Sequence, residues 1–275
     1  MVIDGRAIAK NILNDVANQV AELSFQPVFC DVLVGEDPAS VQYVEMKANT
    51  AEQVGLKFRR ANFPESITTE QLIREIKSIS GEPNMCGLIV QLPLPAHIDR
   101  QAVLNAIDSK IDVDCIGQTN SDLFYSGRAY MEFPTAAAVM EILKQISIDY
   151  KKQDFLVIGQ GQLVGKPVSF LLKQRGCKID VATSATKNTD ELIKNADVII
   201  SAAGQPNLIT GDKIKVGAII IDAGTSEADS GIVGDVDFES VHDKASFVSP
   251  VPGGVGPVTV AMLFRNVLKV AKLKN

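Results

Sequence analysis

The sequence has no tryptophan, two histidines and few aromatic residues, which make up 5% of its 275 positions. Surfaces that bind single-stranded nucleic acid stack bases on aromatic rings, and this chain has too few of them for such a platform. Positive charge is not in excess either, because 27 lysines and arginines stand against 33 acidic residues and give a net charge of −6. We therefore expect no nucleic acid among its partners.

Long apolar runs and paired cysteines are also missing. The best apolar stretches, 198–204 and 216–222, have the length of strands and fall short of the roughly 18 residues of a membrane span, so we expect no membrane partner. The two histidines lie too far apart for a histidine-based metal centre, and we expect no metal. The cysteines form no CxxC pair and are predicted to be reduced, mostly buried thiols: Cys30, Cys86, Cys115 and Cys177.

The first twenty residues do not have the pattern of a signal peptide. Asp4 and Arg6 bring charge at once, and apolar residues then recur at helical spacing from Ile8 to Val20. Asp4 is a candidate N-cap of this amphipathic helix. Without a signal sequence, we expect a cytoplasmic protein.

Predicted strands and helices alternate along the rest of the chain, which predicts an α/β protein with parallel sheets in both halves. The predicted boundary between the halves lies near residues 133–150. Segment 108–132 is predicted to be a long loop, and 222–237 is predicted to be rich in turns. The predicted strands are 27–34, 58–63, 86–90, 154–158, 178–182, 198–202, 218–221 and 247–248, and the predicted helices are 39–54, 69–79, 100–107, 136–146, 164–174, 189–196 and 259–272.

A glycine-rich turn follows the predicted strand 154–158 and precedes the helix 164–174. Its glycines are Gly159, Gly161 and Gly165, a GxGxxxG pattern one residue longer than the usual dinucleotide fingerprint. Small residues there let the backbone approach a pyrophosphate at the positively polarised end of a helix. The segment predicts dinucleotide binding, and the alternative is a tight turn with only a structural role.

The tip of the next strand bears on the choice of dinucleotide. NAD-binding proteins usually carry an acidic residue there for the ribose 2′-hydroxyl. Asp180 lies inside the predicted strand, whereas the strand ends in Thr183 and Ser184, followed by Lys187. Hydroxyls and a cation accept a 2′-phosphate that a carboxylate would repel, so the sequence favours NADP and leaves NAD open. The alternative is that Ser184 is merely a turn residue.

The first half carries polar residues with possible catalytic chemistry. Tyr43 and Lys47 are four residues apart on one helix face, and this pattern taken alone favours a solvated lysine beside a half-buried tyrosine. Gln91 directly follows a predicted strand, at the end where α/β sheets bind ligands, although a loop-capping amide would look the same.

Two further segments are candidates for ligand contact. Asp112 and Asp114 place two carboxylates close together, and a turn, a metal ligand or a recognition carboxylate would fit, with the turn favoured. Segment 250–259 combines prolines and glycines ahead of a helix, which predicts a rigid loop that a ligand approaches closely.

Together these segments resemble the bifunctional methylenetetrahydrofolate dehydrogenase/cyclohydrolase family, known as FolD, across nearly the whole chain. The resemblance rests on the order and spacing of seven segments: 3–6 (IDGR), 34–40 (VGEDPAS), 43–47 (YVEMK), 87–95 (GLIVQLPLP), 112–114 (DVD), 164–167 (VGKP) and 250–259 (PVPGGVGPVT).

The resemblance implies roles for individual residues. Lys47 would be the general acid and base of the cyclohydrolase step, and Gln91 would hydrogen-bond to it and tune it. Tyr43 would pack on the folate ring system, and Asp114 would bind the amino group and ring nitrogens of the pterin. The remaining folate contacts would come from Val90, Leu92, Pro252, Gly253, Gly254, Val255 and Gly256, and the cofactor contacts from Gly159, Gln160, Gly161, Ser184 and Thr225.

The family also implies an architecture and a reaction. Residues 1–133, completed by 250–275, would form an α/β catalytic domain, and 134–249 a Rossmann-type nucleotide-binding domain, with the last helix returning to the N-terminal domain. The enzyme would oxidise 5,10-methylenetetrahydrofolate with NADP, hydrolyse the methenyl product to 10-formyltetrahydrofolate, and serve one-carbon metabolism and purine biosynthesis. It would be a homodimer through its nucleotide-binding domain.

The chain departs from the family pattern mainly in its second half. Gln160 and Gly161 stand where Arg-Ser or Ala-Ser is usual, Thr183 where histidine is usual, and segment 133–138 keeps only Thr135 of the usual helix entry. Two alternatives follow: a cyclohydrolase with weak or lost dehydrogenase activity, and a folate- or nucleotide-binding protein without turnover.

Overall fold

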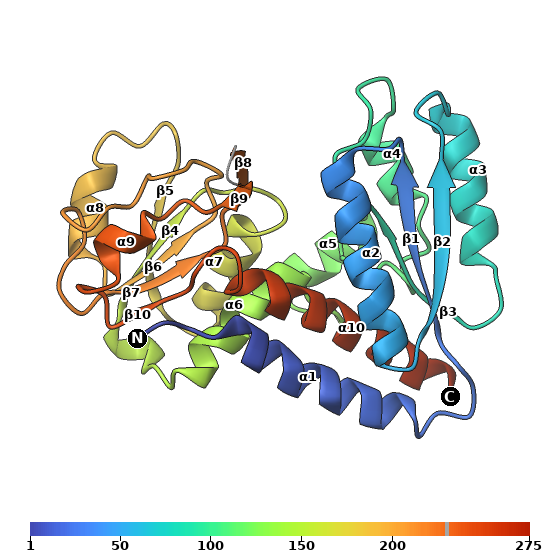
Figure 1. Ribbon diagram of the computed structural model, residues 1–275, viewed down its shortest axis with the longest axis horizontal. Coiled ribbons are helices and arrows are strands. Elements are labelled where there is room, and N and C mark those ends of the chain that lie inside the picture. The colour runs from blue at the N-terminus through green and yellow to red at the C-terminus, as the bar shows by residue number, and fades with distance from the viewer. Residues whose placement is uncertain (229–230) are drawn as a thin grey trace. The chain divides into compact units, whose positions relative to one another are not determined.

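The computed structural model describes residues 1–228 and 231–275 and divides into two compact units (Figure 1). One unit consists of Asn11–Glu132 and Leu263–Asn275, and the other of Met1–Lys10 and Phe133–Met262. The division falls inside the first helix, α1 (Gly5–Val20), and the last, α10 (Val255–Lys274). Each unit has its own parallel sheet, as the alternating pattern predicts.

The unit that contains Asn11–Glu132 is built on three parallel strands in the order β2-β1-β3. These are β1 (Val28–Val34), β2 (Lys57–Phe63) and β3 (Met85–Val90), and every residue of β1 and β3 is buried. The connecting helices are α2 (Pro38–Gln53) and α3 (Thr69–Ser80). Right-handed crossovers in opposite directions place them on opposite faces of the sheet, where Figure 1 shows them.

Local signals fix where these helices begin and end. Asp37 caps α2 by accepting a hydrogen bond of 2.8 Å from Ser40 N, and Pro38 occupies the first turn. Gly55, with a φ of +83°, follows the end of α2 and turns the chain into β2.

The predicted loop 108–132 contains a helix, so that prediction is wrong in part. After α4 (Arg100–Asn105), the segment Gln118–Tyr125 forms α5. Its polar sequence lacks an apolar stripe, and side-chain hydrogen bonds stabilise it instead. Gln118 Nε2 donates to Asp122 Oδ1 at 2.7 Å, and Asn120 Nδ2 donates to Ser109 O at 2.8 Å.

The other unit contains a five-stranded parallel sheet in the order β10-β7-β6-β4-β5. The order reverses beside β4, which makes the carboxyl ends of β4 and β6 the topological switch point where such sheets bind ligands. The strands are β4 (Asp154–Ile158), β5 (Lys178–Ala182), β6 (Val198–Ser201), β7 (Ile219–Asp222) and β10 (Phe247–Val248); the helical segments are α6 (Pro134–Gln145), η1 (Tyr150–Lys152), α7 (Gly165–Gln174), α8 (Thr189–Asn195) and α9 (Phe238–Val241).

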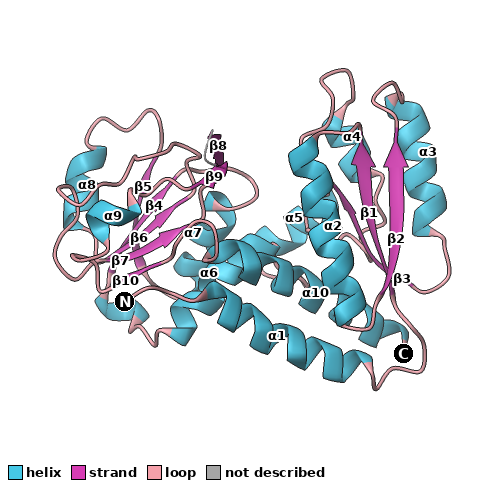
Figure 2. Cartoon of the chain, viewed as in Figure 1, coloured by secondary structure: helices cyan, strands magenta, loops and turns pink. Residues whose placement is uncertain are grey.

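The predicted turn-rich segment 222–237 includes two short antiparallel strands, β8 (Ser226–Ala228) and β9 (Gly231–Val233). Residues 229–230, which fall in the same prediction, lie outside the described residues. Figure 2 shows the hairpin as the small magenta pair apart from the five-stranded sheet.

The carboxyl half of α10 packs in the unit of β1 to β3, which confirms the returning last helix. Phe264 contacts Phe29 of β1 edge-on, with ring centroids 5.2 Å apart. Asn266 Nδ2 donates to Val113 O at 2.9 Å and to Glu132 O at 2.8 Å. Within the described residues, no helix is both long and apolar enough to span a membrane.

Candidate active site

Lys47 lies on α2 and is buried, with 8% of its surface exposed. Its Nζ is 2.7 Å from Oδ2 of Asp31 on β1 and donates a hydrogen bond of 2.8 Å to Oε1 of Gln91, the residue that follows β3. The solvated lysine that the helix pattern alone favours is therefore wrong. A buried ammonium needs such partners, because desolvation penalises an isolated charge by several kcal/mol.

Gln91 is held in one orientation by its own neighbours. Its Nε2 donates to Leu92 O at 3.2 Å, so Oε1 faces Lys47, and its backbone N–H donates to Val32 O at 2.8 Å. Gln91 thus closes the carboxyl end of the sheet and presents an acceptor to the lysine. It does more than cap a loop.

Asp112 and Asp114 reach this region through a segment that runs beside β3. Leu88 N donates to Ile111 O at 2.9 Å, and Leu88 and Asp112 form a parallel bridge. The turn favoured for Asp112 is confirmed, because its carboxylate accepts hydrogen bonds from Gly117 N at 2.9 Å and from Ile116 N at 3.4 Å. Burial raises the pKa of Asp112 to about 6.

Asp114 is half-buried and interacts electrostatically with Lys47, Asp31 and Asp112, which together form a cluster of charged groups. Burial raises its pKa to about 7; the charge of Lys47 acts in the opposite direction, and those of Asp112 and Asp31 add to the rise. A carboxyl group that titrates near neutral pH beside a lysine is typical of functional sites.

The other predicted residues of this unit surround the cluster. Tyr43 lies one turn before Lys47 on α2 and is 37% exposed. Val90 ends β3 and is buried, and Leu92 is partly exposed. Nothing in the sequence analysis singled out Asp31, although an acidic residue within the apolar run of β1 is an unusual feature that could have found it.

The glycine-rich turn between β4 and α7 is compact at two glycines and open at the third. Gly159 has a φ of +88°, and a Cβ there would lie 2.3 Å from Ala202 O, at the end of β6. A Cβ on Gly165 would lie 2.0 Å from Gly159 O, whereas one on Gly161 meets nothing within 4 Å. Gln160 folds back, since its Nε2 donates to Gly159 O at 2.8 Å and to Ser169 Oγ at 3.1 Å.

Ser184 and Thr225, the other predicted cofactor contacts, are exposed at the carboxyl ends of β5 and β7. Nearby, Asp235 holds the loop after β6 by accepting hydrogen bonds from Ser201 Oγ at 2.6 Å, Ala203 N at 2.8 Å and Gln205 N at 2.7 Å. Asp235 was also missed, because its sequence neighbourhood gives no sign of these partners.

The predicted folate loop turns tightly against the start of α1. A Cβ on Gly5 would lie 1.8 Å from Gly254 O, and Gly253 has a φ of +107°. Pro252 and Gly256 are exposed, whereas Gly254 and Val255 are buried. The close approach of the backbone in this loop agrees with its proline and glycine content, and Val255 and Gly256 already belong to α10.

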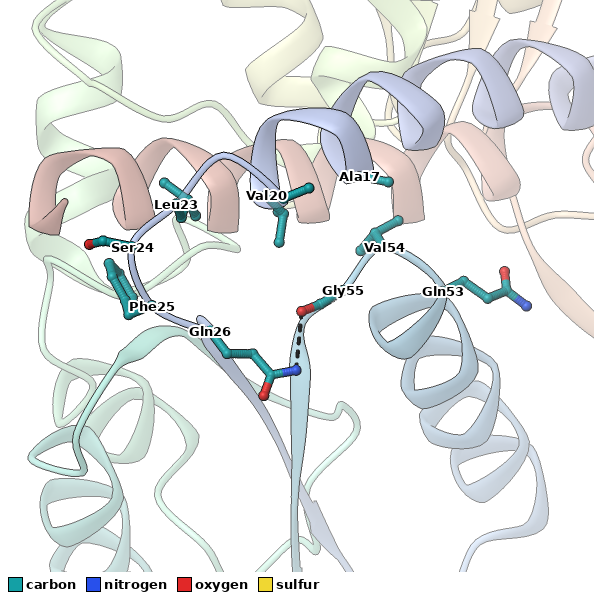
Figure 3. A pocket seen from close by; sticks show the side chains of 10 residues that line it. Ala17, Val20, Leu23, Ser24, Phe25, Gln26, Gln53, Val54 and Gly55 are labelled. Carbon is teal, nitrogen blue, oxygen red and sulfur yellow. Dashed lines mark hydrogen bonds between the residues drawn. The ribbon is translucent and has the colours of Figure 1, made fainter.

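Two cavities of about 540 Å³ each lie away from Lys47. One lies where α1 ends and α2 turns into β2, and there Gln26 Nε2 donates to Gly55 O at 3.3 Å (Figure 3). This is the amino end of the sheet, opposite to Gln91. The other is lined by residues of α5 and the end of α10. Among residues 1–228 and 231–275, no group of three metal-ligating side chains is present, and all four cysteines are free.

Both parts of the chain match models of one family. Residues 3–114 match the tetrahydrofolate dehydrogenase/cyclohydrolase catalytic domain, and residues 134–275 match the NAD(P)-binding domain of the same family. The protein named bifunctional protein FolD from Nautilia profundicola is 42% identical over 275 residues, covering 98% of this chain and 97% of its own length. The protein of that name from Bacillus velezensis is 39% identical, covering 98% and 97%.

Solved structures agree with these relatives. The bifunctional enzyme FolD from Campylobacter jejuni superposes with a TM-score of 0.96 at 36% identity and covers 100% of this chain and 99% of its own. The Trypanosoma brucei methylenetetrahydrofolate dehydrogenase-cyclohydrolase, complexed with NADP cofactor and inhibitor, has a TM-score of 0.94 at 35% identity, with coverage of 100% and 98%. The chain belongs to the tetrahydrofolate dehydrogenase/cyclohydrolase family.

Proposed function

We propose that the chain is the bifunctional enzyme of this family. It oxidises 5,10-methylenetetrahydrofolate to the 5,10-methenyl compound with NADP and hydrolyses that product to 10-formyltetrahydrofolate. The observation that carries the proposal is the buried amine of Lys47, ion-paired and hydrogen-bonded at the carboxyl end of a parallel sheet. Pure binding of a ligand would not need an amine in such surroundings, whereas proton transfer does.

Lys47 is the group that moves protons in the hydrolysis. Water adds its oxygen to the methenyl carbon between N5 and N10, and the amine of Lys47 takes the proton that water loses. The bond from this carbon to N5 then breaks, and the ammonium of Lys47 returns its proton to N5. The added hydroxyl becomes the formyl carbonyl and releases its proton to solvent. Gln91 Oε1 keeps Nζ oriented during both transfers.

We assign folate binding to the surroundings of Lys47. The carboxylate of Asp114 accepts hydrogen bonds from the pterin's amino group and ring nitrogen, a donor pair that matches two carboxylate oxygens. Tyr43 packs on the ring system, and the remaining contacts come from Val90, Leu92 and Pro252–Gly256. In this assignment residues 1–133, completed by 250–275, form the catalytic part, and 134–249 hold the nucleotide.

The nucleotide-binding residues fit a dinucleotide. The turn after β4 lies at the topological switch point, is open at Gly161, and leads into the ten-residue helix α7, whose amino end attracts a pyrophosphate. Gly159, Gln160 and Gly161 would hold it there, with Ser184 and Thr225 exposed nearby. When bound, NADP supplies the acceptor for the hydride that leaves the methylene carbon.

The test follows the methenyl chromophore spectrophotometrically with NADP, with NAD and with no nucleotide. We expect methenyl formation from the methylene compound with NADP and its decay by hydrolysis. If added methenyl compound decays but none forms with either nucleotide, the protein is a cyclohydrolase without dehydrogenase activity. If neither reaction occurs, it is a binding protein without turnover.

We also propose a homodimer joined through the nucleotide-binding part, a cytoplasmic location, and a supply of formyl groups to purine biosynthesis. Neither nucleic acid nor membrane is a partner in this proposal, given the net charge of −6. Sedimentation equilibrium of the full chain tests the dimer.

A further inference from the structure

Asp31 is an acidic side chain at the centre of an apolar sheet. It lies on the middle strand β1 and has no exposed surface. The strand residues before and after it are apolar and buried. A carboxylate in this position is expensive to keep charged and is not needed by the fold, because an apolar residue would complete the strand.

The ammonium of Lys47, 2.7 Å from Oδ2, is the partner of this carboxylate. No other group in the described part of the chain donates a hydrogen bond to either oxygen. Lys47, by contrast, has a second partner in Gln91 Oε1 at 2.8 Å. Among the described residues, Lys47 is thus the only group in direct contact with the Asp31 carboxylate, and Lys47 itself lies between this anion and a neutral acceptor.

We infer that Asp31 is a positioning residue that acts through Lys47, an inference that rests on the proposed hydrolysis. Its carboxylate holds Nζ within hydrogen-bond reach of Gln91 Oε1 and so fixes the direction from which Lys47 meets the attacking water. Asp31 touches neither water nor folate in this role and gives up no proton.

Besides Lys47, two charged groups interact with Asp31: Arg60 of β2 and Asp114 of the segment between α4 and α5. Arg60 of β2 is the register partner of Asp31 and lowers its pKa, but it is also paired with the exposed Glu45 of α2 at 2.5 Å. Asp114 is the other carboxyl group whose proton equilibrium Asp31 and Lys47 affect. Burial raises the pKa of Asp31 more than the positive charges of Lys47 and Arg60 lower it, so the net effect is a raised pKa.

The experiment compares kcat and KM of methenyl hydrolysis, above the uncatalysed rate and without nucleotide, for wild type, Asp31→Asn and Glu52→Gln. Loss of one bond to a charged group slows a step by roughly 10- to 100-fold. In Asp31→Asn we expect kcat to fall about tenfold or more and KM to change less than about threefold. Glu52→Gln, which removes an exposed carboxylate from the same helix α2 and leaves Lys47 and Arg60 unchanged, should match wild type.

An Asp31→Asn enzyme with the wild-type kcat would overturn the inference, as would a loss confined to KM. If this variant does not fold, the carboxyl ¹³C signal of Asp31 is titrated in wild type and in Lys47→Met. We expect the titration to move to higher pH by at least about one unit without the lysine, and an unchanged titration would overturn the pairing. Wild-type hydrolysis in the same assay tests the proposed function separately.

Discussion

Gln91 Oε1 accepts a hydrogen bond of 2.8 Å from Lys47 Nζ, although 44 positions separate the two residues in the chain. The side-chain amide of Gln91 cannot rotate freely, because its Nε2 donates a hydrogen bond to Leu92 O at 3.2 Å. The lysine therefore meets a fixed acceptor on one side and the carboxylate of Asp31 on the other. Such preorganisation costs nothing at the moment of reaction.

Gln91→Met tests the value of this acceptor. Methionine has nearly the length of glutamine but no carbonyl, so the ammonium loses one hydrogen bond. A bond to a charged group contributes about 1.5–3 kcal/mol, so hydrolysis should slow by about 10- to 100-fold in kcat. Steady-state hydrolysis of the methenyl compound measures it, and an unchanged kcat would show that Gln91 does not act on Lys47.

Lys47→Met should abolish hydrolysis and keep the fold, with a stability that depends on pH. The change leaves Asp31 buried without its cation, and burial raises the pKa of Asp31. A carboxyl whose folded pKa is raised binds protons more tightly in the folded state, so the variant loses stability as pH rises. We expect a smaller decrease in unfolding temperature near pH 4, close to the ordinary pKa of an aspartate, than at pH 7. Wild-type hydrolysis rates in this variant would remove Lys47 from the mechanism.

Asp114→Asn should weaken folate binding and remove its pH dependence. The pKa of Asp114 is about 7, and the carboxylate is the form that binds the pterin donors. Folate affinity of the wild type should therefore rise between about pH 6 and pH 8, while the variant stays flat and binds about tenfold or more weakly. Calorimetric titration with folate measures both, and NADP titration serves as control. Equal losses for both ligands would indicate a folding defect.

The sequence predicts the order of strands and helices well, because periodicity and turn residues are local signals. It misses α5, whose helix depends on hydrogen bonds such as that between Asn120 and Ser109 rather than on an apolar stripe. Lys47 looks solvated from its helix alone, since its partners come from β1 and from the end of β3. Burial of charge is a property of the assembled sheet, and so Asp31 was overlooked.

Gly159→Ala and Gly161→Ala form a matched pair in the nucleotide turn. At Gly159 the φ of +88° and the 2.3 Å approach of Ala202 O oppose a methyl group, whereas Gly161 has open space. We expect Gly159→Ala to lower the unfolding temperature and to weaken NADP binding at least tenfold, because the left-handed region alone costs about 1–2 kcal/mol. Gly161→Ala should keep the unfolding temperature. Equal stability of the two variants would contradict the close approach at Gly159.

Gln160→Arg tests the basis of cofactor preference. In the wild type, Gln160 donates to Gly159 O and Ser169 Oγ, so its amide is directed back onto α7 rather than outward to a nucleotide. The end of β5 has hydroxyls and no carboxylate to repel a 2′-phosphate. We therefore expect NADP to be preferred over NAD by less than about a hundredfold.

An arginine at position 160 is longer, cannot accept hydrogen bonds and carries a permanent charge. One added phosphate contact contributes about 1.5–3 kcal/mol, which corresponds to roughly 10- to 100-fold in affinity. The gain should appear as a lower KM for NADP, with NAD little affected. Gln174→Arg is the control, since it adds the same charge at the carboxyl end of α7. This end lies about 13 Å along the helix from its amino end, where the nucleotide turn leads in. The distance exceeds the screening length of about 8 Å at physiological salt. A wild type that strongly prefers NAD, together with an unchanged preference in Gln160→Arg, would show that this turn does not face the 2′-phosphate.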